Sequence, residues 1–429
     1  MNSLVLGQFN SEKCWRGEGL ARLPHISDCN TQTLIGCMDE MLFPFCDKGD
    51  ILLCRYGFDP CLKNYLECIG CDFVSNKEPL EQCNDEASLN VFELISKYPE
   101  RVADIDFDKD TTVQPYSVVH GLSHMAHVLK VYLDVPALES VIKVNSKIYS
   151  CQLAHLLDVG TKGIPVNNCA DLVREGITLL ENGSFLIKDP FGVSGSGNIH
   201  IRSTAMLNRI ANHLKNQSDS IVEFVLEPFL PKKIDFSCHF YINKSGAFRL
   251  VALQIMNNVG VNYMGSSNAD KDFYNKLDKA RYFHTVEAVA KQLFADGYYG
   301  EVCLDSMVLA SDEIVPIVEI NARKSMGLIN YRLDQYLSQW NLHGRLCILN
   351  VGFAKPLCTS YLLDVMDKNH ILWTPNNGSG LILLGINAAR KGFDKGRFYL
   401  CCAADTRDKH EHLIQKMKTV LLELSYKVY

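Results

Sequence analysis

Two carboxylates and an amide in one short stretch have a spacing that suits a divalent cation. Residues 301–322 are expected to form an antiparallel hairpin that turns near residue 312. Because side chains alternate along a strand, this fold places Asp305 opposite Glu319, with Asn321 on the same face. Facing like charges are unfavourable, and a divalent cation would remove that penalty. These oxygen ligands suit Mg²⁺. The alternative is a shifted register that separates the acids at a solvated surface.

A second stretch has the composition of a phosphate-binding loop. The expected strand Phe185–Lys188 is followed by glycines at 192, 195 and 197. Glycines let backbone N–H groups turn toward an anion, and a lysine at the strand end adds a positive charge. The lysine precedes the glycines, so the stretch is not a P-loop. The alternative is an ordinary flexible hairpin.

Two further features fit nucleotide binding but are weak when taken alone. Lys147 follows the capping residue Ser146, and a lysine in the first turn of a helix is unfavourable unless it meets an anion. The segment 223–230 ends a strand in a hinge-like stretch, and Asp235 follows it. Such a segment can bind adenine through its backbone and ribose through a carboxylate. The alternatives are a solvated lysine and an acidic strand end.

The elements around these residues indicate an α/β protein. Residues 49–75 fit a strand–helix–strand unit like half of a Rossmann domain, without the G-x-G-x-x-G of a dinucleotide site. The Asp-rich residues 100–115 are expected to be a solvated connection. Residues 182–332 alternate strands and amphipathic helices, and a mixed α/β segment follows.

Composition limits the classes of function. The 429 residues are 47% hydrophobic and 21% charged with a net charge of −6, which disfavours nucleic-acid or membrane-surface binding. Seventeen cysteines are an odd number in a long chain, so the chain is not a small disulfide scaffold. The first residues do not resemble a signal peptide, and the apolar runs are too short for a membrane span. We therefore expect a reduced, cytoplasmic protein that contacts neither nucleic acid nor membrane, and its oligomeric state stays open.

In combination, the order of these motifs resembles the ATP-grasp superfamily over residues 120–335. The most specific part is Asp305 followed by Glu319-Ile-Asn321-Ala-Arg323. This resemblance implies a Rossmann-like pre-ATP-grasp domain at 1–115, a two-part ATP-grasp domain at 116–340 and a small C-terminal α/β domain at 341–429.

The resemblance also implies a role for each motif residue. Lys147 and Lys188 would contact the ATP phosphates, and Gly192, Gly195, Ser196 and Gly197 would cover them. Glu227 and Leu230 match the adenine hinge, and Asp235 loosely matches the ribose acid. Asp305, Glu319 and Asn321 would bind Mg²⁺ or Mn²⁺, and Arg323 would steady the phosphoryl group in catalysis together with Lys188.

The function implied is an ADP-forming ligase. It would activate a carboxylate, such as that of glutamate, as an acyl phosphate and couple it to an amine or to the thiol of an acyl carrier protein. The Glu-Ile-Asn-Ala-Arg-Lys-Ser-Met-Gly stretch resembles a subgroup from antibiotic biosynthesis that includes pheganomycin peptide and butirosin glutamate–carrier protein ligases. An ATP-grasp kinase acting on a hydroxyl, and a non-catalytic ATP-binding regulator, remain alternatives.

Three other clusters carry less weight. Cys68 and Cys71 could be half of a zinc or redox site, although packing cysteines explain them better. His120, His124 and His127 fit a surface cluster. The basic residues near 390–397 could dock an acidic carrier protein or line a solvated turn.

Overall fold

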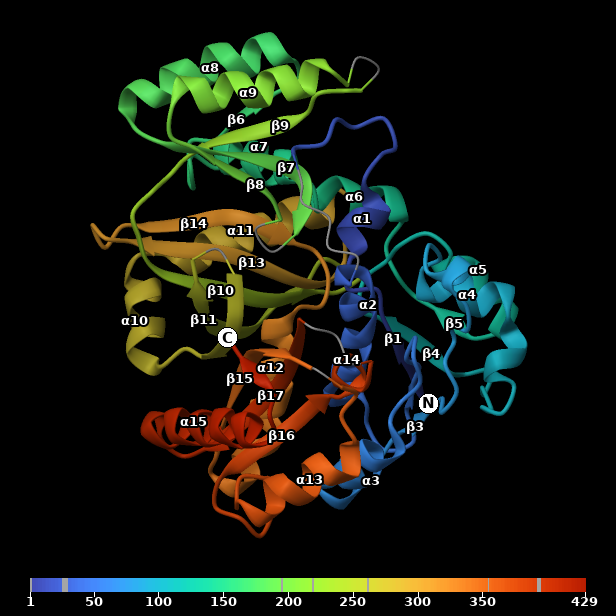
Figure 1. Ribbon diagram of the computed structural model, residues 1–429. Coiled ribbons are helices and arrows are strands. Elements are labelled where there is room, and N and C mark those ends of the chain that lie inside the picture. The colour runs from blue at the N-terminus through green and yellow to red at the C-terminus, as the bar shows by residue number, and fades with distance from the viewer. Residues whose placement is uncertain are drawn as a thin grey trace.

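The computed structural model describes residues 2–24, 30–193, 196–217, 220–260, 262–353, 355–391 and 395–429. Of Val193, Ser196 and Asn262 only the backbone is described. Within these ranges the strands form three sheets. One lies in the amino-terminal part, one lies in an upper subdomain, and the third is a large sheet formed by the rest of the chain (Figure 1).

The amino-terminal sheet is parallel and doubly wound, as the strand–helix–strand pattern predicted. Its order is β3-β2-β1-β4-β5. Asp59 caps α3 by accepting from the backbone of Cys61 and Leu62, with Pro60 in the first turn. The strands are β1 (Ser3–Leu6), β2 (Ile51–Leu52), β3 (Val74–Ser75), β4 (Thr112–Pro115) and β5 (Tyr132–Leu133). The helices are α1 (Ser11–Trp15), α2 (Thr31–Gly36), η1 (Cys37–Phe45), α3 (Pro60–Cys68), η2 (Asn84–Glu86), α4 (Val91–Lys97), η3 (Pro99–Val102) and α5 (Leu122–Leu129).

The expected solvated connection at 100–115 is wrong in its last part. Residues 112–115 form β4, which pairs with β1 in the middle of the sheet, and Val113 is buried. The sheet also extends to β5, past residue 115. A four-residue strand with few apolar side chains is too short to show a burial pattern in the sequence.

The upper subdomain has a four-stranded antiparallel sheet in the order β6-β9-β7-β8, with α8 and α9 on one face (Figure 1). Leu172, Leu207 and Leu214 of these helices pack on Phe185 and Phe224 of the sheet. The elements of this part of the chain are α6 (Leu138–Val144), α7 (Lys147–Leu156), β6 (Ile164–Val166), α8 (Cys169–Asn182), β7 (Phe185–Val193), β8 (Ser196–Ile201), α9 (Thr204–Lys215) and β9 (Phe224–Pro228).

The third sheet is antiparallel and has nine strands. Its order is β14-β13-β10-β11-β12-β15-β17-β16, with β18 on β15. The strands are β10 (Lys232–Ile242), β11 (Phe248–Val259), β12 (Asn262–Asn268), β13 (Gly300–Leu309), β14 (Ile314–Asn321), β15 (His343–Gly352), β16 (Gly380–Gly385), β17 (Gly396–Ala404) and β18 (Lys427–Val428). The helices are α10 (Lys271–Lys279), α11 (Tyr282–Ala295), α12 (Met326–Leu337), η4 (Ser338–Trp340), α13 (Thr359–Lys368), α14 (Asn387–Arg390) and α15 (Arg407–Glu423). The segment after residue 341 therefore extends the sheet that carries the hairpin β13–β14.

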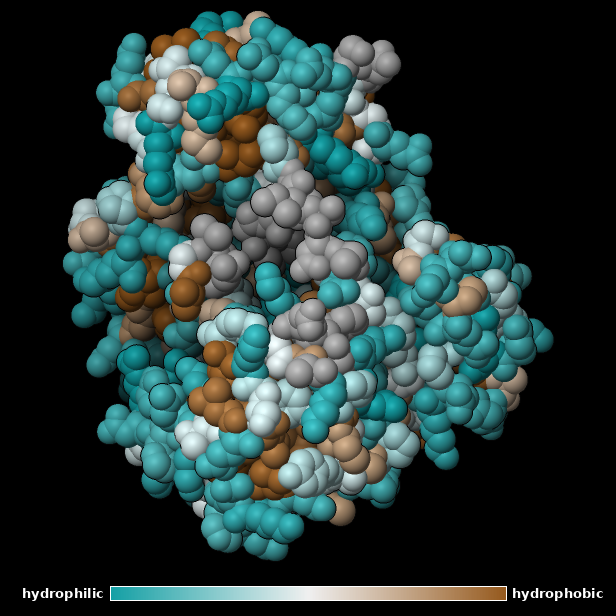
Figure 2. Space-filling model, viewed as in Figure 1, coloured by the Kyte–Doolittle hydropathy of each residue, from teal (hydrophilic) through white to brown (hydrophobic). Residues whose placement is uncertain are grey.

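The described ranges contain no helix that is both long and apolar enough to cross a membrane. Every cysteine in these ranges is a free thiol. The face in Figure 2 is hydrophilic over most of its area, with hydrophobic side chains in small groups.

Candidate active site

The hairpin β13–β14 has the register that the sequence predicted. Asp305 pairs with Glu319, and Cys303 pairs with Asn321. Asp305 is half-buried, and its pKa is raised to about 7. Burial is the larger cause, and the charge of Glu319 is the next. Two facing acids, one of them inclined to keep its proton, form a set of oxygens that a divalent cation would stabilise.

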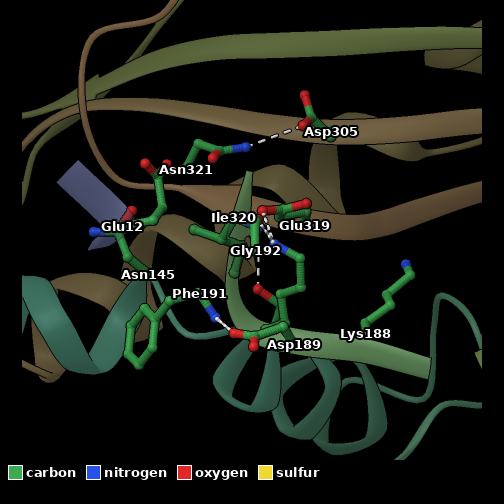
Figure 3. Close-up of polar contacts among 12 residues, drawn as sticks. Glu12, Asn145, Lys188, Asp189, Phe191, Gly192, Asp305, Glu319, Ile320 and Asn321 are labelled. Carbon is green, nitrogen blue, oxygen red and sulfur yellow. Dashed lines mark hydrogen bonds and ion pairs between the residues drawn. The ribbon is translucent and has the colours of Figure 1, made fainter. Parts of the chain in front are cut away.

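The Asn321 amide connects this pair to Arg323. Its Nδ2 donates to Asp305 Oδ2 at 3.0 Å (Figure 3), and its Oδ1 accepts from Arg323 Nη2 at 3.1 Å. The amide therefore turns its nitrogen toward the carboxylate. To offer its oxygen to a cation beside Asp305, Asn321 must turn over and release Arg323.

Lys147 joins the upper subdomain to the hairpin. Ser146 caps α7 by accepting from Ile148 N, which fixes the lysine in the first turn. The buried Lys147 Nζ donates to Glu319 Oε1 at 2.5 Å and to the carbonyl oxygen of Gly192 at 2.7 Å. Its positive charge at the helix start is thus balanced by a carboxylate, which is the kind of partner that the sequence position required.

Lys188 lies in a second buried ion pair. Its Nζ is 2.5 Å from Glu227 Oε1, and Thr161 Oγ1 donates to Glu227 Oε2 at 2.8 Å. The space between the two lysines is a cavity of about 10 Å³ lined also by Cys151. A cavity of this size holds about one water molecule. The two lysines are therefore held by carboxylates in a closed site.

The expected hinge lies beside a small apolar group. Leu230 follows β9 and packs with Val318 against Met307 and neighbouring side chains of β13 and β14. Asp235 lies near the start of β10, on the sheet face that carries Asp305, and it pairs with Lys232 at 2.6 Å and accepts from Asn258 at 2.7 Å. The hinge, the two lysines and the acidic hairpin thus surround one region between the upper subdomain and the large sheet.

The described glycines of this stretch, Gly192 and Gly197, lie in the two strands of the hairpin β7–β8. Lys188 pairs with Asn198, and Val193 pairs with Ser196. Gly197 has a φ of +96°, and a Cβ there would lie 2.9 Å from the Cα of Gly192. Gly195 lies outside the described residues. The predicted loop is therefore the tip of two longer strands.

Sequence reasoning missed Glu12, which belongs to α1 of the amino-terminal part. Its Oε1 accepts from Arg323 Nε at 3.1 Å and from Nη2 at 2.5 Å. Arg323 Nη1 donates to the Tyr116 hydroxyl at 3.3 Å and to Lys324 O at 3.2 Å. Together with the Asn321 contact, all five guanidinium donors have acceptors. Burial acts to lower the pKa of Arg323, but the charge of Glu12 raises it above its ordinary value.

The weaker clusters do not assemble into sites. His120, His124 and His127 are exposed, and so is Cys68. The described residues contain no group of three or more His, Cys, Asp and Glu side chains that could hold a metal. A larger cavity of about 270 Å³ lies at the amino-terminal sheet, between residues that follow β1 and β2 such as Asn10 and Arg55.

These features define the class of the molecule: the chain has the fold of the ATP-grasp enzymes. Biotin carboxylase of Campylobacter jejuni superposes with a TM-score of 0.57 at 12% identity, over 100% of this chain and 92% of that one. N5-carboxyaminoimidazole ribonucleotide synthetase of Thermus thermophilus gives 0.52 at 14% identity, over 98% of both chains. N5-carboxyaminoimidazole synthase of Aspergillus clavatus, solved with ADP and 5-aminoimidazole ribonucleotide, gives a TM-score of 0.51 at 12% identity, over 86% of this chain and 97% of that one.

One protein of characterised activity is similar to this chain in amino-acid sequence. The [butirosin acyl-carrier protein]–L-glutamate ligase of Niallia circulans is 26% identical over 155 residues. The match spans only about a third of that protein and of this chain, 36% of each. No family model matches the chain.

Proposed function

We propose that this chain is an ATP-dependent, ADP-forming ligase that activates a carboxylate and transfers its acyl group to an amine or thiol. The register of Asp305 against Glu319 carries the proposal, because it sets two acids and Asn321 beside the phosphate lysine Lys147. The similar enzymes solved with nucleotide support ATP as the co-substrate.

The oxygens of Asp305, Glu319 and Asn321 fit Mg²⁺ or Mn²⁺. The raised pKa of Asp305 supports this fit, since burial and the facing charge of Glu319 disfavour its ionised form, and Asp305 forms no ion pair among the described residues. When bound, such an ion would neutralise phosphate oxygens and orient the triphosphate. Lys147 and Lys188 would exchange their carboxylate partners for phosphate oxygens, which opens the closed site.

The apolar group around Leu230 would receive the adenine, with the backbone after Glu227 as its hydrogen-bonding edge. Asp235 would accept from a ribose hydroxyl in place of Lys232 and Asn258. The backbone of the β7–β8 turn, with Gly192 and Gly197, would cover the phosphates and exclude water from the reaction.

The chemistry would take two steps. A carboxylate oxygen of the substrate attacks the γ-phosphorus, the bond to the β-phosphate oxygen breaks, and ADP leaves. The nucleophilic nitrogen or sulfur of the acceptor then attacks the acyl carbon, and inorganic phosphate leaves. Arg323 would lower the repulsion between the carboxylate and the γ-phosphate, and Lys188 would stabilise charge on the transferred group.

The partial match to a glutamate–carrier protein ligase favours an amino acid as the carboxylate and an acyl carrier protein as one possible acceptor. Antibiotic biosynthesis in the cytoplasm is the setting this proposal implies. Of the basic residues considered for carrier docking, Arg390 lies 3.4 Å from Asp59 and Lys391 stacks on the Tyr56 ring.

The test is a screen of amino acids for ADP release, run with and without a phosphopantetheinylated carrier protein, followed by mass spectrometry of the product. ADP release that requires both a carboxylate and an acceptor supports the ligase. ADP release with a phosphorylated hydroxyl product would contradict it, as would ATP binding without turnover over the whole panel.

A further inference from the structure

Helix α1 contacts two parts of the site that are far apart in the sequence. It follows β1, and Trp15 anchors it by donating from Nε1 to Val118 O at 2.8 Å. On one side Glu12 holds Arg323 at the end of β14. On the other side Arg16 pairs with Asp189 at the root of the β7–β8 hairpin. One short helix therefore contacts both the acidic hairpin, β13–β14, and the hairpin β7–β8, which we call the phosphate hairpin.

The Glu12 contact extends to the proposed cation ligands. Glu12 binds Arg323, Arg323 donates to Asn321 Oδ1, and Asn321 Nδ2 donates to Asp305. Both Glu12 and Arg323 are almost fully buried, with side-chain exposures of 6% and 12%. Glu12 Oε2 is buried without a hydrogen-bond partner among the described residues. The orientation of the Asn321 amide thus depends on a residue of the amino-terminal part.

The Arg16 contact fixes the root of the second hairpin. Asp189 comes directly after Lys188, and its Oδ1 also accepts from Phe191 N at 2.9 Å (Figure 3). Arg16 and Asp189 have side-chain exposures of 11% and 8%, so water screens this pair weakly. The pair therefore restrains the strand that carries Lys188 and Gly192.

The chain after α1 continues into the upper subdomain. Ile221 N donates to Gly19 O at 2.7 Å, and Ala21 N donates to Ile221 O at 2.9 Å. Ala21 and Leu23 are buried in the core of this subdomain. In Figure 1 the dark blue segment that follows α1 rises beside the green strands. Residues 12–23 thus connect the amino-terminal sheet to both hairpins.

We propose that Glu12 and Arg16 are positioning residues for the reaction. Glu12 accepts two hydrogen bonds from Arg323, so that Arg323 stays paired when the Asn321 amide turns its oxygen toward the cation, and Arg16 sets the position of the β7–β8 hairpin. This inference rests on the proposed function, which gives those hairpins their roles. It adds that an amino-terminal helix aligns the cation ligands with the phosphate-binding strand.

The first test measures Arg16 in the protein without nucleotide. Hydrogen exchange compares wild type with two variants. The first is Arg16→Met, and the second is Arg16→Met/Asp189→Asn, which also removes the unpaired acid. We expect exchange of the hairpin amides in 185–193 and 196–201 to rise by about tenfold in both variants. Arg22→Met is the matched control, because Arg22 is exposed and contacts the upper subdomain through its backbone. Unchanged exchange in the double variant would overturn the role of Arg16.

The second test measures Glu12 through the cation. Glu12→Ala is expected to weaken binding of Mn²⁺–ADP by about tenfold, because Arg323 without Glu12 retains the Asn321 oxygen. Glu12→Gln, which keeps an oxygen for Arg323, should lose much less. Binding of ADP in EDTA should be the same in all three proteins, because Glu12 acts on the cation ligands. If wild type fails to bind Mn²⁺–ADP, the proposed function falls. If wild type binds and Glu12→Ala binds equally well, the positioning role falls.

Discussion

Lys147 Nζ and Glu319 Oε1 lie 2.5 Å apart, so a predicted phosphate ligand is paired with a predicted cation ligand. The second lysine is held in the same way by Glu227. Each lysine thus has a carboxylate where a phosphate would otherwise balance its charge. This arrangement keeps buried charges paired while the proposed nucleotide site is closed.

We expect Glu319→Gln and Asn321→Ala to abolish most ADP formation while the fold persists. Loss of one cation ligand removes several kcal/mol of stabilisation from the developing charge, which lowers the rate by at least about 100-fold. ADP release and far-ultraviolet circular dichroism measure the two effects. Glu313→Gln is the control, since Glu313 lies in the exposed turn of the same hairpin. Near-normal turnover in folded Glu319→Gln would remove the cation assignment.

Lys188→Met should weaken ATP binding and also destabilise the protein. The lost partner leaves Glu227 as a buried unpaired charge, which costs about 3–5 kcal/mol of folding free energy. The double variant Lys188→Met/Glu227→Gln removes that charge. We therefore expect calorimetry to show recovered thermal stability in the double variant and titration to show ATP affinity still low. Recovery of both would mean that Lys188 serves the fold alone.

Gly197→Val should slow turnover by disturbing the phosphate hairpin. Its φ of +96° suits glycine, and the added Cβ would lie 2.9 Å from Gly192 Cα and 3.2 Å from Asp189 Cβ. Gly183→Ala is the matched control, because its φ of +140° is strained alike but no atom lies within 4 Å of the added Cβ. Steady-state kinetics compare the two. Equal effects on turnover would show that backbone strain, and not the hairpin contact, causes the loss.

The sequence predicted the acidic hairpin well because its information is local. Alternation along two strands and a short turn are enough to place Asp305 opposite Glu319. Glu12 could not be predicted in this way, since 311 residues separate it from Arg323 and only the tertiary fold brings α1 beside the residues that follow β14. A glutamate in a five-residue helix carries no pattern that names its partner.

The sheet boundaries were harder to predict than the hairpin for a similar reason. β5 has two residues and cannot show alternation, so nothing in the sequence indicates that the first sheet continues beyond residue 115. β12 is rich in Gly, Ser and Asn, yet it joins β11 to β15 and so makes one sheet of two expected domains. We propose a first boundary after β5, with 341–429 as an extension of the large sheet.

The raised pKa of Asp305 predicts that pH and Mg²⁺ act together on the stability of the folded protein. Its pKa of about 7 means that the folded protein keeps a proton that the unfolded chain, with a pKa of about 4, has released. This group therefore lowers folded-state stability as pH rises from about 4 to 7. Mg²⁺ binds the ionised form, so its stabilising effect should be larger at about pH 8 than at about pH 6.

Thermal unfolding with and without Mg²⁺ at the two pH values measures this effect. Asp39 and Glu40 also have raised pKa values, about 7 and about 8, so wild type alone does not isolate Asp305. Asp305→Asn supplies the comparison, because it retains the other two acids. In that variant the Mg²⁺ effect should be small at both pH values. A Mg²⁺ effect in wild type that does not change with pH would contradict the role of Asp305.

Oxygen transfer separates the acyl-phosphate route from the other uses of an ATP-grasp fold. In the proposed first step a substrate carboxylate oxygen becomes the bridge to phosphorus, and it leaves with phosphate when the acceptor attacks the acyl carbon. A substrate labelled with ¹⁸O in its carboxylate should therefore give phosphate that carries one ¹⁸O atom, as mass spectrometry can measure. A kinase would leave the label in the substrate, and simple ATP hydrolysis would give unlabelled phosphate.

Arg323 should affect this step strongly, since two unit charges at about 4 Å repel by about 4 kcal/mol at an effective dielectric constant of about 20. The double variant Glu12→Gln/Arg323→Met, which leaves no buried charge unpaired, should therefore lose turnover and retain nucleotide binding. Unlabelled phosphate from a wild-type turnover that yields coupled product would rule out the acyl-phosphate route.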